Sequence, residues 1–542
     1  MYVLKINGQE YQFEKMQSLK ELASSSRFIC AKVNNRLREL SYVINHDAKV
    51  QFLDIKDQNA MRVYETTLRY VILKALYNLY PDKSFRYINS VSRSYLLLST
   101  DTDECLDQSL LIKLDKEVQR LIHTDLPIKR IRVSVAEAKA IFLKQKMYDK
   151  VEMLKYRKTK FVNLYQCENY YNYLYGYMMC NTQDISNYRL LLHNPGILVS
   201  YPRADLEGEI PEYAPNHIYD KLVTKAIDKV ELLNIDSVNS LNTFIGKNSG
   251  NTLINMAETI HNNELTHLAD TIEMSIRNIK LICVAGPSSS GKTTFTKRLQ
   301  VELLARGLKP VMISIDNYYK AMADIPKGDD GDYDFETIRA FDIKRFNQDL
   351  KALLAGDKVR LRERDMYTKE VIDFGETVQL AANSPIIIEG IHALNDLLTS
   401  SIANKYKFKI YISPVLALNI DDHSPINLTD ARMLRRIVRD KKFRNLPAER
   451  TLELWDDVRA GEFKWIYPYS INVDYVFNSN LLYELSVMKK YAIDSLNDIK
   501  VESANYIEAN RLLKFLRYID EIDDAGVPAN SLLREFIGGS SY

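Results

Sequence analysis

The feature that most constrains this chain is a glycine-rich turn in the middle of the sequence, between an apolar run and a helical segment. Residues 286–293, GPSSSGKT, fit the pattern G-x-x-x-x-G-K-[ST]. They follow the run LICVA directly and precede TTFTKRLQVELLARG. The glycines let backbone N–H groups turn inward around a phosphate, and the N-terminal end of the next helix attracts the same anion. The pattern predicts a nucleotide phosphate site formed by Gly286, Pro287, Ser288, Ser289, Ser290, Gly291, Lys292, Thr293 and Thr294.

The totals of the 542-residue chain indicate a folded protein of roughly three domains. Lys plus Arg number 73 against 71 Asp plus Glu, so no overall basic excess points to nucleic acid or to an anionic membrane. The five cysteines are scattered and form no C-x-x-C pair, which argues against a disulfide framework or a cysteine zinc site. No run approaches the roughly 18 apolar residues of a membrane span, and the alternating start MYVLKINGQEYQF does not read as a signal peptide. We expect a cytoplasmic protein with no membrane partner.

The order of apolar patterns predicts an α/β protein with additional domains in front of its main sheet. Short alternating runs around the turn Asn7-Gly8 indicate a small β-grasp domain, and MQSLKELASSS has helical spacing. A long helix follows from Ala60 and ends at Pro81. Later, five apolar runs alternate with helices, which is typical of a doubly wound parallel sheet covered on both faces. The expected divisions are 1–58 (β-grasp), 59–230 (α+β), 231–279 (helical connector), 280–480 (doubly wound sheet) and 481–542 (helical extension).

Two carboxylates are expected beside the glycine-rich turn. Asp316 ends the run PVMISID and Glu389 ends PIIIE, and the carboxyl ends of parallel strands meet in the crevice where such sheets bind ligands. Lys292 would bridge the β- and γ-phosphates, and the Thr293 hydroxyl would bind Mg²⁺. Asp316 could accept a proton from an attacking hydroxyl and help to hold the metal, and Glu389 suits a contact to Mg²⁺. The alternative is that both acids are ordinary strand-end residues.

The segment ARMLRRIVRDKKFR is a helix rich in arginine. A solvated helical face is the usual reading of such a run. In a phosphotransferase the same residues can close over the site as a lid and offset the charge of the transferring phosphoryl group. The arginines concerned are Arg432, Arg435, Arg436, Arg439 and Arg444.

Together these pieces resemble the uridine kinase and phosphoribulokinase family of P-loop kinases. The shared motifs are GPSSSGKTT, IDNYY, DYDF, IIIEGIHAL, and RRIVRD followed by Arg444. The resemblance implies ATP- and Mg²⁺-dependent phosphorylation of a primary hydroxyl, with Asp316 as base and Lys292, Thr293 and Glu389 at the phosphates and metal. It also implies that Arg439 and Arg444 act as lid arginines, and that the acceptor is bound by Tyr319, Tyr333, Asp334 and Arg436.

The acceptor is the main alternative left open. Uridine-cytidine kinases read the pyrimidine with an aromatic residue and a histidine, where this chain has RERDMYTKE with Arg364, Met366 and Lys369. A last lid arginine of those enzymes corresponds here to Leu446. The 5′-hydroxyl of a uridine- or cytidine-like ribonucleoside is the predicted acceptor, and a sugar or sugar phosphate is the alternative because of the added cations.

The front of the chain resembles the TGS domain and the second, editing-type domain of threonyl-tRNA synthetases, through AKVNNRLRELSYVINHDAKVQFLDIKD and the helix after it. That domain carries H-x-x-x-H and C-x-x-x-H ligands, but Thr66, Tyr70 and Tyr171 replace the histidines here and only Cys167 remains. Zn²⁺ prefers imidazole and thiolate ligands, so we expect metal-dependent deacylation to be lost. With LNIDDH and LREFIGGSSY, the whole chain resembles bacterial nucleoside kinases fused to this front.

A rival function is an RNA-binding regulator gated by nucleotide, with the basic stretch KRIRVSVAEAKAIFLKQK as its RNA contact. A solvated helix face is the plainer reading of that stretch. The sequence leaves open a homo-oligomer and the role of the front half.

Overall fold

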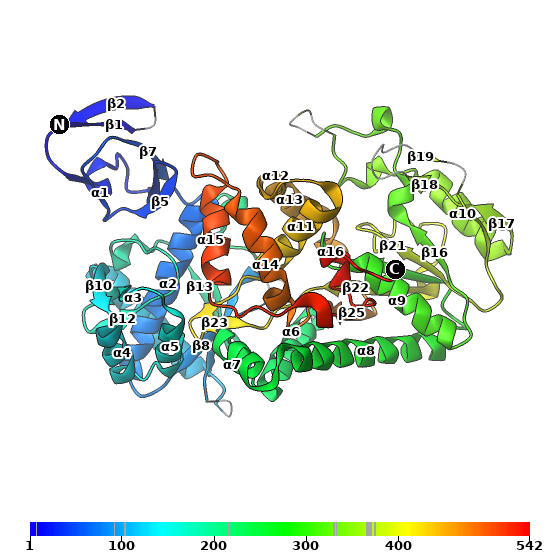
Figure 1. The fold of residues 1–542 in the computed structure, drawn as a ribbon, viewed down its shortest axis with the longest axis horizontal. Helices are drawn as coiled ribbons and strands as arrows, with labels where there is room; N and C mark the ends of the chain where they lie inside the picture. The colour runs from blue at the N-terminus through cyan, green and yellow to red at the C-terminus, as the bar shows by residue number, and fades with distance from the viewer. Residues whose placement is uncertain are drawn as a thin grey trace.

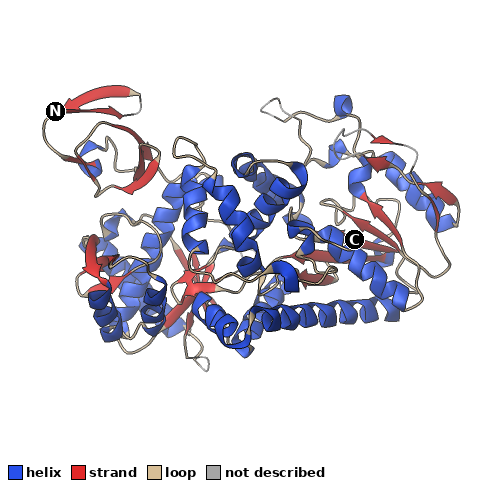
Figure 2. Ribbon diagram, viewed as in Figure 1, coloured by secondary structure: helices blue, strands red, loops and turns tan. Residues whose placement is uncertain are grey.

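A computed structural model describes residues 1–6, 8–90, 93–101, 104–213, 217–328, 331, 333–364, 371–372 and 375–542, with only the backbone of 217–219 and 371–372. A small sheet lies near the N-terminus, a helix-rich middle follows, and a parallel sheet lies at the other end of the molecule (Figure 1). Figure 2 shows helices between the N-terminal sheet and the parallel sheet at the other end. In the described part of the chain, no helix has the length and apolar character needed to span a bilayer.

The N-terminal sheet has five strands in the order β2-β1-β7-β4-β5. The expected hairpin is confirmed, because β1 pairs with β2 in antiparallel register around Gly8; Asn7 lies outside the described residues. The helix expected over MQSLKELASSS is much shorter than predicted. It covers only α1 (Leu19–Leu22), where Ser18 and Glu21 form a capping box and Ala23 is already extended. The three serines that follow favour turns over helix. The strands are β1 (Tyr2–Ile6), β2 (Gln9–Phe13), β4 (Cys30–Val33), β5 (Arg36–Glu39) and β7 (Ala48–Leu53).

The next region is built around one buried helix, α2 (Gln58–Leu79). Asp57 caps its start by accepting from the amides of Asn59 and Ala60, and the helix ends before Pro81, as expected. Most of its residues from Ala60 to Leu76 are buried, so neighbours cover it on every side. Those neighbours are α3 (Gln108–Thr124), α4 (Val135–Lys144), α5 (Tyr148–Met153) and two sheets, β10-β11-β12 and β13-β14-β9-β8. The strands of these sheets are β8 (Phe85–Asn89), β9 (Tyr95–Ser99), β10 (Lys129–Ser134), β11 (Phe161–Cys167), β12 (Tyr170–Asn172), β13 (Arg189–His193) and β14 (Gly196–Ser200).

Three helices lead from this region to the parallel sheet: α6 (His217–Leu232), α7 (Val238–Asn248) and α8 (Gly250–Met274). α8 runs beneath the parallel sheet in Figure 1 and packs along the first helix of that sheet, α9 (Lys292–Ala305). Its buried face includes Leu253, Leu265 and Leu268.

The parallel sheet confirms the predicted doubly wound α/β class. Its five strands lie in the order β16-β21-β15-β22-β25, and all four neighbouring pairs are parallel. They are β15 (Leu281–Ala285), β16 (Val311–Ser314), β21 (Ile386–Glu389), β22 (Lys407–Ser413) and β25 (Tyr475–Asn478), matching the five apolar runs of the sequence. All five residues of β15 are buried, which is expected of a central strand covered on both faces. The first strand thus carries the glycine-rich turn at its carboxyl end.

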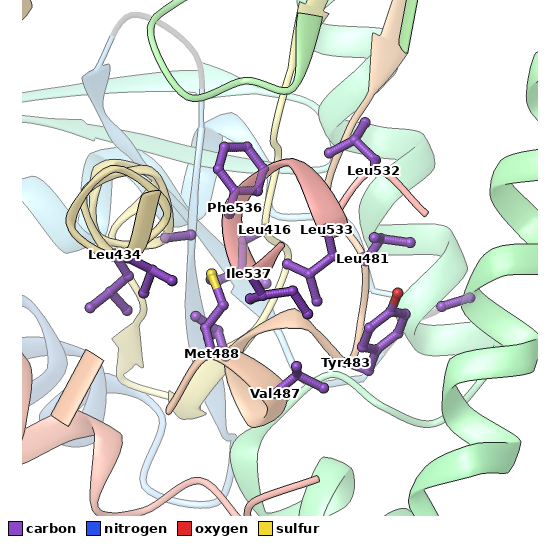
Figure 3. Close-up of a cluster of buried hydrophobic side chains, with 14 of the residues drawn as sticks. Leu416, Leu434, Leu481, Tyr483, Val487, Met488, Leu532, Leu533, Phe536 and Ile537 are labelled. Atoms are coloured by element: carbon purple, nitrogen blue, oxygen red, sulfur yellow. The ribbon is translucent and has the colours of Figure 1, made fainter. Parts of the chain in front are cut away.

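The C-terminal extension is packed into the core of this α/β unit. It contains α14 (Glu484–Asn497), α15 (Tyr506–Leu516) and the short α16 (Arg534–Ile537). Leu533, Phe536 and Ile537 lie among Leu434 and Met488 in one buried cluster (Figure 3). The same cluster includes Phe295 and Leu299 of α9. The extension therefore lies close to the helix that begins at the glycine-rich turn.

A hairpin of the α/β unit is inserted into the front half. β23 (Asn419–Asp421) and β24 (Ser424–Pro425) carry LNIDDH. The Lys150 Nζ lies 2.7 Å from Asp421 Oδ2, and both side chains are at most 3% exposed. The amide of Tyr87 donates to the Asp422 carbonyl over 2.7 Å, and Arg69 donates to the His423 carbonyl over 2.5 Å. The hairpin leads directly into the arginine helix, α11 (Leu428–Arg444).

Candidate functional site

The glycine-rich turn forms a tight loop at the carboxyl end of β15. A Cβ on Gly286 would lie 2.1 Å from the carbonyl oxygen of Ile412, and Gly291 has a φ of +88°, so both positions require glycine. The Lys292 ammonium folds back over the loop and donates to the carbonyls of Gly286 and Pro287, over 3.0 and 3.2 Å. Ser289 and Ser290 are buried, and their hydroxyls have no hydrogen-bond partner in the described part of the chain. Thr293 is exposed at the start of α9.

Two neighbouring strands bring Asp316 and Glu389 to this loop. Glu389 is the last residue of β21 and pairs in register with Ser314 of β16. Asp316 follows two residues later, in the turn after β16. The Ser314 hydroxyl donates to Glu389 Oε1 over 3.2 Å. The structure thus places together the lysine and two carboxylates that the sequence analysis assigned to the phosphates and the metal.

The electrostatics of the cluster follow from its burial. Burial raises the pKa of Glu389 to about 7, and the neighbouring charge of Asp316 adds to that shift. Burial also raises the pKa of Asp316, while the charges of Lys292 and Arg364 oppose the increase. Burial lowers the pKa of Lys292, and nearby carboxylates oppose this. Two acids with raised pKa values beside one cation form a site that an additional cation would stabilise.

The protein supplies only some of the oxygen ligands that Mg²⁺ needs, and water and nucleotide phosphates would supply the rest. Among the described residues, no group of three or more His, Cys, Asp or Glu side chains could hold a metal ion. Mg²⁺ usually takes one or two carboxylates and completes its shell with water and substrate phosphates. The neighbouring carboxylates of Asp316 and Glu389 match that requirement, and the exposed Thr293 follows Lys292 directly in the chain.

The arginine helix divides into two groups. Arg432 and Arg435 are buried and brace the loop. Arg432 Nη1 lies 3.0 Å from Glu462 Oε2, and its Nη2 donates to the Ser288 carbonyl over 3.1 Å. Arg435 pairs with Glu484, and both side chains are 0% exposed. These two arginines therefore act as structural supports in this conformation, which differs from the lid assignment of the whole run.

The second group gathers around Asp440, which is 0% exposed. Its oxygens lie 3.3 Å from Arg436 Nε, 3.6 Å from Arg439 Nε and 3.2 Å from Arg444 Nη1. Arg436 also donates to the Ser288 hydroxyl over 3.0 Å, so it contacts the loop. Arg439 influences the pKa of Lys292, which places it near the cluster. Partial burial lowers the pKa values of the Arg436 and Arg439 guanidinium groups, whose side chains are 11% and 17% exposed.

Of the residues assigned to the acceptor, Arg436 lies at the loop, and Tyr319 lies close enough to Asp316 for this carboxylate to raise the pKa of its hydroxyl, after burial. The Tyr319 hydroxyl donates to the Phe335 carbonyl over 3.0 Å, and the Arg364 guanidinium lies 4.3 Å from the Tyr319 ring centroid. Asp334 Oδ1 accepts from the amides of Glu336 and Thr337, so this oxygen stabilises the local turn. Tyr333 is 39% exposed. Met366 and Lys369 lie outside the described residues, and Leu446 follows the C-terminal end of α11.

Four carboxylates near the site were not identified from the sequence. Glu462 and Glu484 hold the buried arginines, and Glu336 has a pKa raised to about 7 by burial and by Glu462. Glu535 accepts from the Thr294 amide at the start of α9, over 3.1 Å. Glu462 also pairs with Arg459, three residues earlier. Its contact with Arg432, and the contacts of Glu484 and Glu535, span 30 or more residues, so no local pattern marks them.

The synthetase-like positions of the front half carry well-packed side chains. The Thr66 hydroxyl donates to the Arg62 carbonyl one helical turn earlier. The Tyr70 hydroxyl is bonded to the carbonyls of Tyr165 and Tyr170. Cys167 is buried, which raises the pKa of its thiol to about 11. A thiol with this pKa is protonated near neutral pH and is a poor metal ligand.

Comparison with known proteins adds to this geometry. Residues 281–482 match the model of the Phosphoribulokinase / Uridine kinase family. This part of the chain is a domain of that family. The uridine kinase of Borrelia duttonii (strain Ly) is 29% identical over 225 residues, which cover 39% of this chain and 95% of that protein. A solved structure titled as a possible uridine kinase from Bacillus stearothermophilus has 16% identity and covers 39% of this chain and 100% of that one, at a TM-score of 0.26. That score is too low to support an inference.

The front of the chain is similar to threonine–tRNA ligases. The ligase of Lactobacillus gasseri is 24% identical over 191 residues, which cover 34% of this chain and 29% of that protein. The similarity therefore reaches less than a third of the ligase. The chain joins a synthetase-like front to a domain of the kinase family.

Proposed function

We propose that this chain is an ATP-dependent kinase that transfers the γ-phosphate to a primary hydroxyl, the 5′-hydroxyl of a uridine- or cytidine-like ribonucleoside. The observation that carries the proposal is the meeting of Lys292, Asp316 and Glu389 beside a G-x-x-x-x-G-K-T loop, at the carboxyl ends of adjacent parallel strands. Phosphoryl transfer depends mainly on positioning and charge neutralisation, and this cluster supplies both.

In the proposed reaction the loop amides and Lys292 bind the ATP phosphates. Asp316 accepts the proton of the attacking hydroxyl. Its pKa is raised by burial, which makes its carboxylate a stronger base than an exposed aspartate. Thr293, Asp316 and Glu389 would hold Mg²⁺, which supplies charge neutralisation at the phosphates when bound. Arg439 and Arg444, beside Asp440, would offset charge on the transferring group.

The acceptor is bound, in this proposal, on the side of Asp316 where Tyr319, Tyr333 and Asp334 lie, with Arg436 at the edge of the loop. The stacking of Arg364 on Tyr319 favours a second candidate, a sugar or sugar phosphate. The Arg364 guanidinium opposes the increase in the pKa of Asp316, so it lies near the proposed base. There it would attract an anionic acceptor.

The test is phosphorylation by Mg·ATP of a panel of ribonucleosides, sugars and sugar phosphates. Asp316→Asn should lower kcat by about 10² to 10⁴, and Lys292→Ala should abolish turnover. Asp357→Asn, at an exposed position, makes the same chemical change away from the site and should leave the rate unchanged. Full activity in Asp316→Asn would sink the assignment of the base.

Arg364→Met separates the two acceptor classes. Loss of activity toward sugar phosphates, with unchanged activity toward nucleosides, would favour the phosphorylated acceptor. An equal effect on both classes would assign the arginine to positioning Tyr319.

A second function, RNA binding, is supported by a cationic cluster where the front half meets the C-terminal extension. Burial lowers the pKa of Lys514, and four arginines add to that shift: Arg517, Arg38, Arg130 and Arg36. Arg38 and Arg130 lie over the rings of Tyr42 and Tyr177. Cations interleaved with aromatic rings are typical of single-stranded nucleic-acid surfaces.

The RNA candidate is tested with the full chain. Association should weaken as the salt concentration rises. Arg130→Gln should reduce the slope of log K against log salt concentration by about 1, which corresponds to the loss of one phosphate contact. Lys358→Gln, an exposed cation of the kinase-family domain, is the matched control. Association that is independent of salt would contradict this candidate.

A further inference from the structure

The amide of Thr294 already has an anionic partner within the chain. Thr294 is the third residue of α9, so its N–H group is one of the first-turn donors that lack an acceptor inside the helix. It donates to Glu535 Oε2 over 3.1 Å. Helix N-termini that follow a loop of this type bind phosphate through such amides. A carboxylate of the chain therefore lies where a nucleotide phosphate would be expected.

The backbone that carries Glu535 is fixed against the loop. Leu533 and Phe536, on either side of it, are 0% exposed and belong to the core cluster of Figure 3. The Ser531 hydroxyl donates to Glu258 Oε1 over 2.6 Å. Leu532 lies so close to Gly291 that a Cβ at that glycine would come within 2.5 Å of Leu532 Cδ2.

Only the side chain of Glu535 can therefore leave the loop easily. It is partly exposed, whereas Leu533 and Phe536 are fully buried. A side-chain rotation is much easier than extraction of Leu533 and Phe536 from a close-packed core.

The charge of Glu535 acts on the same groups that the proposed reaction uses. It contributes to the raised pKa of Glu389, after burial and Asp316. It also opposes the lowering of the Lys292 pKa that burial causes. Glu535 is thus an additional negative charge at a site expected to receive the negative phosphates of a nucleotide.

We propose that the Glu535 carboxylate is an internal competitor of the nucleotide for the Thr294 amide. The proposal rests on nucleotide binding at this loop, as proposed above. A phosphate and the carboxylate cannot accept from the same N–H group at the same time. Each phosphate ligand must therefore displace Glu535, and its apparent affinity is reduced by the fraction of molecules in which the carboxylate is bound. The segment around α16 thereby sets how tightly the site holds nucleotide.

The experiment measures binding of Mg·ATP and of Mg·pyrophosphate to the full chain by calorimetry. Glu535→Gln keeps the size of the side chain and removes its charge. It should tighten both ligands by on the order of tenfold, because the repulsive charge is removed and the Thr294 amide keeps only a weaker, neutral acceptor that a phosphate displaces more easily. Glu521→Gln is the matched control, since Glu521 is an exposed carboxylate of the same extension. It should change neither affinity, and Glu535→Ala should behave like Glu535→Gln.

Unchanged or weaker ATP binding in Glu535→Gln, with the wild type binding normally, overturns the proposal and leaves the proposed function standing. Weaker ATP binding with unchanged pyrophosphate binding would show that Glu535 contacts the nucleoside part instead. If neither the wild type nor the variant binds either ligand, the proposed function and this inference fall together.

Discussion

The buried pair of Arg435 and Glu484 permits a quantitative test of how the arginine helix supports the loop. Both side chains are 0% exposed, and Arg435 Nε lies 3.2 Å from Glu484 Oε1. Arg435 also donates to the Ser479 carbonyl over 2.7 Å, and Glu484 accepts from the Leu481 amide over 3.0 Å. Replacing one partner leaves an uncompensated buried charge.

We expect Arg435→Met and Glu484→Leu each to lower the free energy of unfolding by about 3 to 5 kcal/mol. The double variant removes both charges together, and buried pairs replaced by apolar residues are often close to neutral. It still leaves the Ser479 carbonyl and the Leu481 amide without their partners, at about 1 kcal/mol each. The double variant should therefore lose only about 2 kcal/mol, well below the sum of the two single losses.

The assay is urea unfolding followed by tryptophan fluorescence. The chain has 2 tryptophans, Trp455 and Trp465, and both lie on α13 (Trp455–Trp465) of the kinase-family domain. The signal therefore reports on this domain and avoids transitions of the front half, which matters because a multidomain chain does not unfold in one step. Arg450→Met, which breaks an exposed pair with Glu453, should cost less than about 1 kcal/mol. If the double variant loses as much as the two single variants added together, the two residues are not coupled and the reasoning is refuted.

Two further predictions concern other buried charges. Lys150→Met should lower the free energy of unfolding by about 3 to 5 kcal/mol because it leaves Asp421 buried without its cation, whereas Lys155→Met, at an exposed pair, should cost less than about 1 kcal/mol. Both lysines lie in the front half, so this urea unfolding is followed by far-ultraviolet circular dichroism, which reports on the whole chain. Glu336→Gln tests a pH dependence. The pKa of Glu336 is raised by burial from 4.5 to about 7, so the folded state binds its proton more tightly, and this contribution to stability is present below pH 4.5 and lost as the pH rises through 7. Relative to the wild type, the free energy of unfolding of Glu336→Gln should therefore increase by on the order of 3 kcal/mol between pH 4.5 and pH 8. Glu376→Gln, at an exposed position, should show no such trend. A constant difference between Glu336→Gln and the wild type across this range would contradict the assigned pKa shift.

The parallel sheet was predictable because its determinants are local. Each strand is an apolar run, and GPSSSGKT fixes where the first strand ends. The expected alternation with helices fails after β21, where turns and the short 3-10 helix Asn404–Tyr406 lead to β22. The rule that carboxyl ends of parallel strands share one edge was enough to bring Asp316 and Glu389 to the loop. The small N-terminal sheet was predictable for the same reason, from alternation and one hairpin turn.

The partners of the arginine helix and of the Thr294 amide could not be predicted, because they come from distant segments of the chain. The spacing of the arginines predicts a helix, but Glu484 lies 49 residues beyond Arg435 and nothing in the sequence links the two. The contact of Glu535 with Thr294 spans 241 residues. Local patterns also misled in one place, since MQSLKELASSS has helical spacing but forms a single turn.

The inserted hairpin β23–β24 changes how the chain can vary over evolution. Asp421 and His423 contact Lys150, Arg69 and Asn172 of the front half, so a chain shortened to the kinase-family domain would lose the partners of both hairpin residues. The hairpin also leads into α11, whose Arg432 donates to the Ser288 carbonyl of the glycine-rich turn. Loss of the synthetase-like front would therefore require simultaneous changes in this hairpin. A substitution in this hairpin therefore acts on both parts of the chain at once.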